Sequence, residues 1–303
     1  CTSVVTTVGV SQVCRLVCSI TDKMSVCAHV IRSYRYGVHQ WTCSAVFKFV
    51  IVLIRRQTPV SKRKESSAAS DVNKRPAHTA VDKAESEPEL AHAINAVAPA
   101  VMAEEAARLN AAMVHYSTDY VFDGCKTDAY VESDITNPLG VYGRSKLEGE
   151  QAIIAAGIPH LILRTSWVYG LRGGNFLLTM QRLFKERDAL NVVSDQFGAP
   201  TWSRMIAEAS AQIIAQQPFL ENSGTYHLTN TGNISWYDFA QSILARTILP
   251  VGKQVTLNAI PSSQYPTAAK RPTNSVLSTD KVQETFGICM PDWEASLDRC
   301  LEG

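Results

Sequence analysis

The chain has 303 residues, of which 46% are hydrophobic, and its 29 basic and 28 acidic side chains leave a formal net charge of +1. That length can bury a sizeable core in one large or two modest domains. The near-neutral charge gives no reason to expect a nucleic-acid or polyanion partner.

Residues 1–75 show no clear periodicity. Residues 44–54 are apolar, but the run is too short to cross a bilayer, since spanning takes about 20 apolar residues, and Lys48 interrupts it. We therefore expect a buried strand there and no membrane anchor. Residues 55–75 are basic, a pattern more typical of a solvated spacer than of a binding patch. The eight cysteines include no CxxC spacing and no nearby His pairing, so we expect no zinc site.

From about residue 76 the pattern changes to alternating helices and strands. The expected strands cover residues 113–122, 160–169 and 226–228. The expected helices cover residues 87–95, 100–110 (with Pro99 at its start), 141–156 (ending before Gly157), 173–187, and 235–246 (with Ser235 as N-cap). This alternation predicts an α/β fold with a doubly wound parallel sheet.

Three side chains in this part could reduce a ketone. Thr118 lies toward the carboxyl end of the apolar strand expected at 113–122, and ligands of open α/β sheets bind at such ends. Tyr142 and Lys146 are four residues apart, so on a helix they share a face. An ammonium close to a phenol favours the phenolate, so Lys146 is expected to lower the Tyr142 pKa from its usual value. Such a tyrosine can exchange a proton with a carbonyl oxygen.

The spacing Tyr-x-x-x-Lys is weak on its own, because chance pairs of this kind commonly decorate a solvated helix face. The upstream strand end at residues 117–122 (Ser-Thr-Asp-Tyr-Val-Phe) strengthens it. Together these motifs resemble the extended short-chain dehydrogenase/reductase superfamily, and within it the dTDP-4-dehydrorhamnose reductase family. The resemblance runs from about Ala77 to the C-terminus. It also includes residues 77–85, 164–169, 195–201, 271–275 and 291–293.

The resemblance implies a role for each matching residue. Tyr142 would be the acid that protonates the C4 oxygen of the sugar while NADPH delivers hydride, and Lys146 would lower its pKa and bind the nicotinamide ribose. Thr118 would hydrogen-bond the same oxygen. The remaining matches are cofactor-binding (Ala77, His78, Thr79 and Tyr116, with Tyr142 and Lys146) and substrate-binding (Asp119, Trp167, Asn175 and Arg271, with Thr118).

Structural alternatives exist for several of these residues. Trp167 could be a core aromatic, Asp119 could cap or orient a loop, and His78 could be a structural histidine. Arg271 could pair with an acid of the C-terminal domain.

The front of the chain departs from the family pattern. A dinucleotide-binding enzyme of this class opens with a strand, a G-x-x-G-x-x-G turn and a helix. Residues 1–75 contain only Gly9 and Gly37, and neither lies in such a motif. We expect residues 1–75 to be an unassigned, non-homologous segment of a truncated, fused or mis-assembled reading frame. Residues 76–170 would be the remainder of an incomplete Rossmann-like dinucleotide-binding domain. Residues 171–303 would be mainly a smaller C-terminal α/β substrate domain, with some elements returning to the sheet.

The leading interpretation is therefore NADPH-dependent reduction of dTDP-4-dehydro-6-deoxy-L-mannose to dTDP-L-rhamnose for surface polysaccharide, in the cytoplasm. NADH remains possible as the cofactor, and a homodimer as the assembly. The family's Mg²⁺ at a dimer contact cannot be assigned. An inactive fragment, or a non-catalytic binding or regulatory protein resembling the methionine adenosyltransferase β subunit, is the alternative that the absent glycine turn favours. A sugar epimerase or dehydratase is a weaker one.

Overall fold

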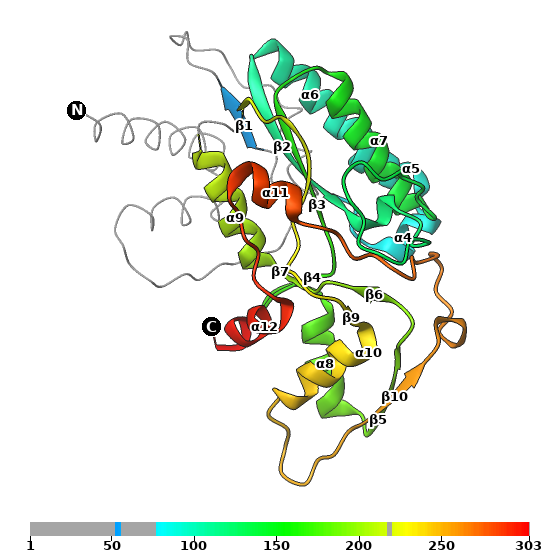
Figure 1. The fold of residues 1–303 in the computed structure, drawn as a ribbon. Helices are drawn as coiled ribbons and strands as arrows, with labels where there is room; N and C mark the ends of the chain where they lie inside the picture. The colour runs from blue at the N-terminus through cyan, green and yellow to red at the C-terminus, as the bar shows by residue number, and fades with distance from the viewer. Residues whose placement is uncertain (1–51, 56–76, 217–219, 303) are drawn as a thin grey trace, which may run out of the picture.

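The computed structural model describes residues 52–55, 77–216 and 220–302 (Figure 1). The expectations for residues 1–51 and 56–76 fall outside this part of the chain. They include most of the strand expected at 44–54 and the basic spacer.

The central element is a four-stranded sheet with the order β1-β2-β3-β8. Its strands are β1 (Val52–Arg55), β2 (Ala111–Thr118), β3 (His160–Thr165) and β8 (Gly224–His227). The last three are mutually parallel, as predicted, whereas β1 runs antiparallel to β2. The expectation of a purely parallel sheet is therefore wrong at this edge, where an antiparallel neighbour satisfies the ladder hydrogen bonds equally well. Because Arg55 pairs with Ala111, the carboxyl end of β1 lies at the start of β2.

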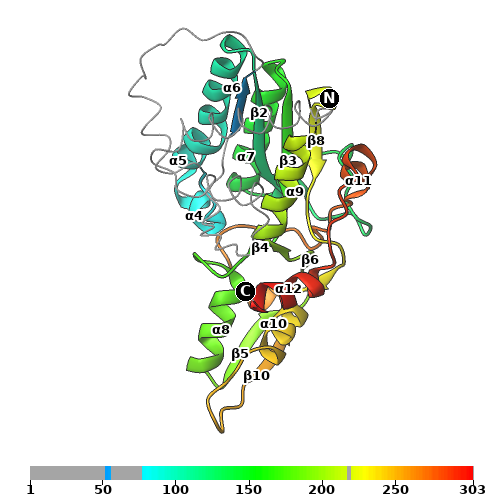
Figure 2. The ribbon, with the colours of Figure 1, turned by 90° about the vertical axis from the view of Figure 1, so that its left-hand side faces the viewer.

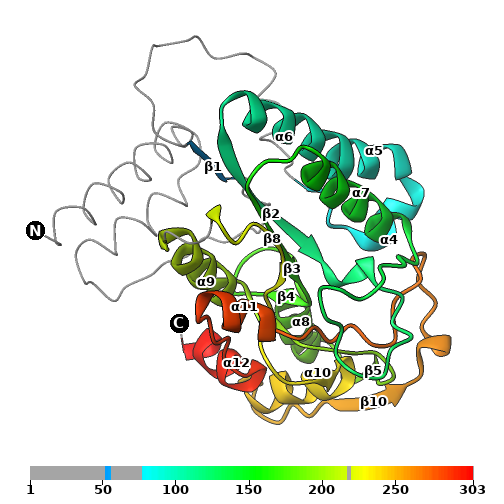
Figure 3. The ribbon, with the colours of Figure 1, turned by 45° about the horizontal axis from the view of Figure 1, so that its top comes forward.

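Helices cover both faces of this sheet (Figures 2 and 3). Successive residues of a strand point to opposite faces, so Val114 and Leu161 pack into one core cluster and Met113 and Ile162 into another. The Val114 side is covered by α9 (Ser203–Ala215), and the Met113 side by α6 (Ala98–Arg108) and α7 (Val141–Ala155). These layers confirm the α/β class.

The two helices expected at 87–95 and 100–110 form one continuous helical run. After α4 (Val81–Ser86), the chain passes from α5 (Pro88–His92) through a π-helical turn, η1 (Ala93–Val97), into α6. Pro99 lies inside this run because the π-turn accommodates it: proline has no N–H for the carbonyl of Asn95, four residues earlier. That carbonyl instead faces α7, where a Cβ on Gly149 would lie 2.1 Å from it.

Three smaller sheets have two strands each. They are β4 (Val168–Tyr169) with β7 (Thr201–Trp202), β6 (Phe197–Gly198) with β9 (Ile234–Ser235), and β5 (Ala189–Val193) with β10 (Thr256–Ile260). With α8 (Phe176–Glu186) and α10 (Trp236–Ala245), the β5–β10 pair lies away from the four-stranded sheet (Figure 2). The chain closes with η4 (Ser262–Gln264), α11 (Asp280–Phe286) and α12 (Trp293–Glu302).

Several predicted boundaries are confirmed at the level of single residues. The Ser235 hydroxyl accepts the N–H of Asp238 as the N-cap of α10, and Gly157 follows α7 with a φ of +65°. The strand expected at 113–122 instead ends at Thr118, where the 3₁₀ turn η2 (Asp119–Val121) begins. The strand expected at 160–169 is interrupted because Trp167 adopts a φ of +46°.

Within the described ranges no helix is long and apolar enough to span a bilayer. The three cysteines there are free thiols, and no group of His, Cys, Asp and Glu in the same ranges could hold a metal ion.

Candidate active site

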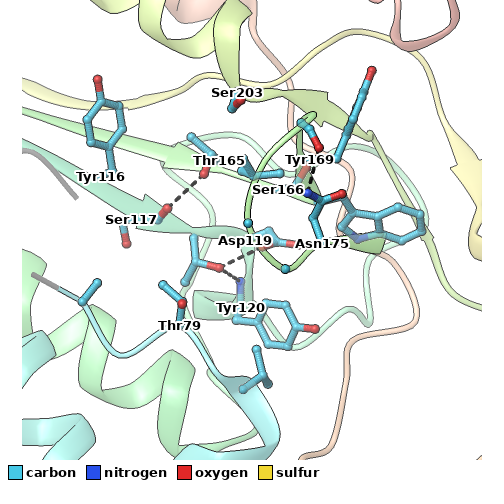
Figure 4. Close-up of a pocket in the computed structure, with 18 of the residues that line it drawn as sticks. Thr79, Tyr116, Ser117, Asp119, Tyr120, Thr165, Ser166, Tyr169, Asn175 and Ser203 are labelled. Carbon is cyan, nitrogen blue, oxygen red and sulfur yellow. Dashed lines mark hydrogen bonds between the residues drawn. The ribbon is translucent and has the colours of Figure 1, made fainter. Parts of the chain in front are cut away.

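A cavity of about 430 Å³ opens at the carboxyl ends of β2 and β3 (Figure 4). Its wall combines residues 77–81, the end of β2 with η2, the first turn of α7, and the loop between β3 and α8. The predicted site residues in this wall are Ala77, Thr79, Tyr116, Thr118, Asp119, Tyr142, Trp167 and Asn175. The structure thus gathers residues that are about 100 positions apart in the sequence.

Thr118 and Tyr142 are the two hydroxyl-bearing side chains predicted to act on a ketone. The Thr118 hydroxyl donates to Asp119 Oδ1 at 2.9 Å and accepts the N–H of Tyr120 at 3.2 Å. Tyr142 is buried, which raises the pKa of its phenol, while a hydrogen bond with Thr118 acts in the opposite direction. At neutral pH the phenol therefore holds its proton.

Lys146 does not act on Tyr142 as predicted. Its Nζ donates to the carbonyl oxygen of Tyr116 at 2.6 Å and lies 3.1 Å from His115 Nε2. Burial lowers the Lys146 pKa to about 7, and the charge of Glu150 acts in the opposite direction. The prediction that Lys146 lowers the Tyr142 pKa is wrong for this arrangement, because burial of the phenol dominates and the ammonium is directed at β2.

Asp119 lies beneath the cavity, where it is 2% exposed. Burial raises its pKa to about 6, against hydrogen bonds from Thr118, Ser275 and the backbone that lower it. Its position fits both interpretations of the sequence, since it lines the cavity and also orients the turn at Thr118.

A buried amide clamps the segment that carries Ala77, His78 and Thr79. Asn95, in the π-turn, accepts the N–H of His78 at 3.0 Å and donates to its carbonyl at 3.1 Å, while also donating to Ser145 Oγ. The His78 ring turns away from the cavity toward Glu87 Oε2, 3.4 Å from Nε2. Of this segment only Ala77 and Thr79 line the cavity.

The loop between β3 and α8 forms an aromatic wall of the cavity with Trp167 and Tyr169. Trp167 stacks on Trp236 with ring centroids 3.4 Å apart, and its left-handed backbone is strained for an aromatic residue, a feature that clusters at functional sites. Asn175 lines the cavity but uses its amide structurally, accepting the N–H of Leu178 as N-cap of α8 and donating to the Gly170 carbonyl at 2.8 Å. Tyr116 donates its hydroxyl to Ser210 at 2.8 Å.

Arg271 does not line the cavity. Its Nη2 lies 2.7 Å from Asp82 Oδ2, and the second oxygen of that carboxylate accepts the N–H of Ala269 at 3.1 Å. The pairing acid therefore belongs to α4 and not to the C-terminal part of the chain, which corrects the alternative drawn from the sequence.

Two residues that position α7 were missed by the sequence analysis. Glu85 Oε1 accepts the N–H of Val141 at 2.7 Å, so an acid from α4 stabilises the positive end of the α7 dipole. Gly143 lets the helix approach η2, because a Cβ there would lie 2.1 Å from the Tyr120 carbonyl oxygen. The glycine following Tyr142 was the available signal, but only the fold shows what approaches it.

Comparison with known proteins finds relatives over the part of the chain that carries this cavity. The family described as "RmlD substrate binding domain" matches residues 54–303. The dTDP-4-dehydrorhamnose reductase of Escherichia coli (strain K12) is 46% identical over 231 residues, covering 74% of this chain and 76% of the relative.

Two solved structures are similar over the same part. The dTDP-4-dehydrorhamnose reductase of Bacillus anthracis, in complex with NADP, has a TM-score of 0.70 at 34% identity and covers 77% of this chain and 83% of that one. That of Clostridium acetobutylicum has a TM-score of 0.69 at 40% identity, with coverages of 75% and 78%.

Proposed function

Because this chain belongs to the dTDP-4-dehydrorhamnose reductase family, we propose that it reduces the C4 ketone of dTDP-4-dehydro-6-deoxy-L-mannose to give dTDP-L-rhamnose, with NADPH as reductant. The observation that carries the proposal is the convergence of Thr118 and Tyr142 on one cavity at the carboxyl ends of parallel strands. A ketone oxygen placed between these two hydroxyls would have both a donor and a proton source.

The residues present suit the nicotinamide end of the cofactor. Ala77 and Thr79 offer small side chains and backbone groups to the cavity, and Tyr116 and Tyr142 add a flat wall. When bound, the cofactor supplies hydride to the sugar carbon. The described residues contain no glycine-rich turn between a strand and a helix that could hold its pyrophosphate. The carboxyl end of β1 lies beside the start of β2, at the end of the sheet away from the cavity.

Tyr142 would donate the proton. The phenol holds its proton at neutral pH, so that proton is available to a developing alkoxide. The Thr118 hydroxyl, held by Asp119 and by the N–H of Tyr120, would orient the same oxygen. Lys146 would bind the nicotinamide ribose. For this, its Nζ would replace its contact with the Tyr116 carbonyl or with His115 Nε2 by one with a ribose hydroxyl.

The nucleotide-sugar would extend from this cavity toward the aromatic wall. Trp167 offers a flat face for a sugar or base, and Asp119 offers an acceptor for a sugar hydroxyl. The Arg271 guanidinium would meet the pyrophosphate. For this role the Arg271 guanidinium either leaves the Asp82 carboxylate or binds the phosphates while still paired with it. Asn175 would contribute by holding the loop at Gly170, to whose carbonyl its amide donates.

The fold supports a division of labour. We infer that β2, β3 and β8, with helices on both faces, are the retained part of a doubly wound Rossmann-like sheet. The layer of α8, α10, β5 and β10 would be the substrate domain. Association through a homodimer stays part of the proposal, supported by the family's behaviour alone.

A non-catalytic nucleotide-sugar-binding role is the second candidate. It is favoured by the front of the sequence, where residues 1–75 contain only two glycines. It predicts that the chain binds the nucleotide-sugar without consuming NADPH.

Replacement of Tyr142 by Phe tests the proposal. Removing one hydroxyl should lower kcat by roughly 10²- to 10⁴-fold, the usual contribution of a general acid, with little change in stability. Tyr237→Phe is the matched control, because its hydroxyl bonds to Gln241 and Leu257 away from the cavity. Equal turnover in both variants would refute the role of Tyr142.

A further inference from the structure

We propose that Trp236, which does not line the cavity, is a positioning residue for the nucleotide-sugar. Its ring packs on Trp167, at the start of the loop between β3 and α8, and on Phe176, directly after the end of that loop. The loop (residues 166–175) forms one wall of the cavity. The inference rests on the proposed binding of a nucleotide-sugar there, and it adds a residue that acts through the wall.

Trp236 reaches the loop from the layer that holds α8 and α10. It is the first residue of α10, and these two helices lie side by side (Figures 1 and 2). Its ring is parallel to that of Trp167, with an interplanar angle of 5° and centroids 3.4 Å apart, and it is tilted against Phe176 with centroids 4.5 Å apart. One half-buried side chain therefore contacts both ends of the loop.

The backbone of Trp167 requires support from its surroundings. Its φ of +46° lies in the left-handed region, which a bulky residue keeps only where neighbouring groups hold it. Its carbonyl accepts the N–H of Thr201 at 3.2 Å, and its indole lies against Gly198, where an added Cβ would be 2.5 Å from Cε2. Gly198 pairs with Ile234, two residues before Trp236. The β6–β9 pair thus fixes both groups that hold the indole, and Trp236 supplies the flat one.

The middle of the loop has little to fix it. Residues 171–174 are exposed, and a Cβ added to Gly173 or Gly174 would meet no atom within 4 Å. At its far end, Asn175 caps α8 and donates to the Gly170 carbonyl. The position of the loop therefore depends on its ends, and Trp236 contacts the aromatic side chain at each end.

Replacing Trp236 by Leu keeps an apolar group and removes the flat surface. Trp167 should then leave its stacked position, and the nucleotide-sugar should bind roughly 2- to 10-fold more weakly, the usual worth of an aromatic pair. In turnover, KM should rise while kcat changes little, because Thr118 and Tyr142 are held by β2 and α7. A tryptophan that only filled the core would change stability and leave the affinity as it was.

The experiment is ¹⁹F NMR of the full chain labelled with 5-fluorotryptophan, with the Trp167 resonance assigned by its loss in Trp167→Phe. Trp236→Leu should shift this resonance toward that of an exposed fluorotryptophan. Calorimetry should show weaker binding of dTDP-L-rhamnose, the product of the proposed reaction. Trp236→Phe keeps a flat ring and should restore part of both. The control is Trp293→Leu, since Trp293 packs edge-to-face on Phe239 of the same core and should leave both readouts unchanged.

The outcomes separate this inference from the proposed reaction. If Trp236→Leu does not fold, Trp236→Met, which fills irregular gaps better, takes its place. An unchanged Trp167 resonance or an unchanged affinity in the folded variant overturns the inference, as does an equal loss of affinity in Trp293→Leu. Because product binding needs no turnover, the expected shifts in a chain that leaves NADPH unconsumed would support the inference and refute the reduction. A wild-type chain that does not bind dTDP-L-rhamnose would refute both.

Discussion

The packing of α7 against η2 fixes where Tyr142 lies, and Gly143 is the contact that permits it. A Cβ added to Gly143 would lie 2.1 Å from the Tyr120 carbonyl oxygen and 2.9 Å from Pro138 Cβ. Neither neighbour can turn away cheaply, because one is backbone and the other a proline ring. In Gly143→Ala, therefore, the first turn of α7 has to move by about 1 Å to reach an ordinary contact distance, and Tyr142 moves with it.

A displacement of about 1 Å in a reacting group can reduce a rate on the order of 10²-fold. Helix propensity acts in the other direction, since alanine stabilises a helix interior by about 1 kcal/mol relative to glycine. We expect the clash to outweigh that gain. Gly143→Ala should therefore lose both activity and thermal stability.

The assay is substrate-dependent oxidation of NADPH, followed beside a thermal melt. Arg144→Ala is the matched control, because this exposed neighbour in the same turn makes only a 3.5 Å contact with the Leu139 carbonyl. A Gly143→Ala variant that keeps full turnover and melts at a higher temperature would show that the close approach does not position Tyr142.

Two further changes address the residues around this turn. Burial raises the Asp119 pKa from 3.8 to about 6, so between these values the folded chain binds more protons than the unfolded chain, and stability falls by about 3 kcal/mol as pH rises through them. Asp119→Asn should flatten this part of the stability profile in urea titrations, and an unchanged slope would contradict the assignment. Glu85→Gln should destabilise the chain by about 0.5–1 kcal/mol, because it removes a charge from the N-terminus of α7 while keeping an acceptor for the Val141 N–H. A salt-insensitive loss of the same size would contradict that origin.

The sequence predicted those elements whose signals are local. Ser235 was identified as a cap because its hydroxyl needs only the N–H of Asp238. The strands β2 and β3 were found because both faces of a covered sheet require continuous apolar residues. The place of Thr118 at the cavity followed from the rule that ligands bind at the carboxyl ends of parallel strands, whereas Tyr142 was placed with it by the resemblance to the family.

Features that depend on tertiary contacts could not be predicted in the same way. The π-turn that carries Asn95 exists because Pro99 frees a carbonyl and Gly149 makes room for it, and the pattern of residues 87–110 does not encode the neighbouring helix. The destination of the Lys146 ammonium depends on the carbonyl of Tyr116, a backbone group that no motif specifies.

Arg271 shows a third kind of limit. Its match to the family suggested a phosphate contact, whereas its position is set by Asp82, 189 residues earlier in the chain. A pairing over that separation follows from the fold and leaves no local pattern in the sequence.

The most direct test of the central claim is to supply the purified full chain with NADPH and dTDP-4-dehydro-6-deoxy-L-mannose, and to follow the absorbance of NADPH. We expect oxidation that depends on the nucleotide-sugar and yields dTDP-L-rhamnose. A folded chain that binds the nucleotide-sugar and leaves NADPH unconsumed would contradict the reductase assignment and support the non-catalytic role.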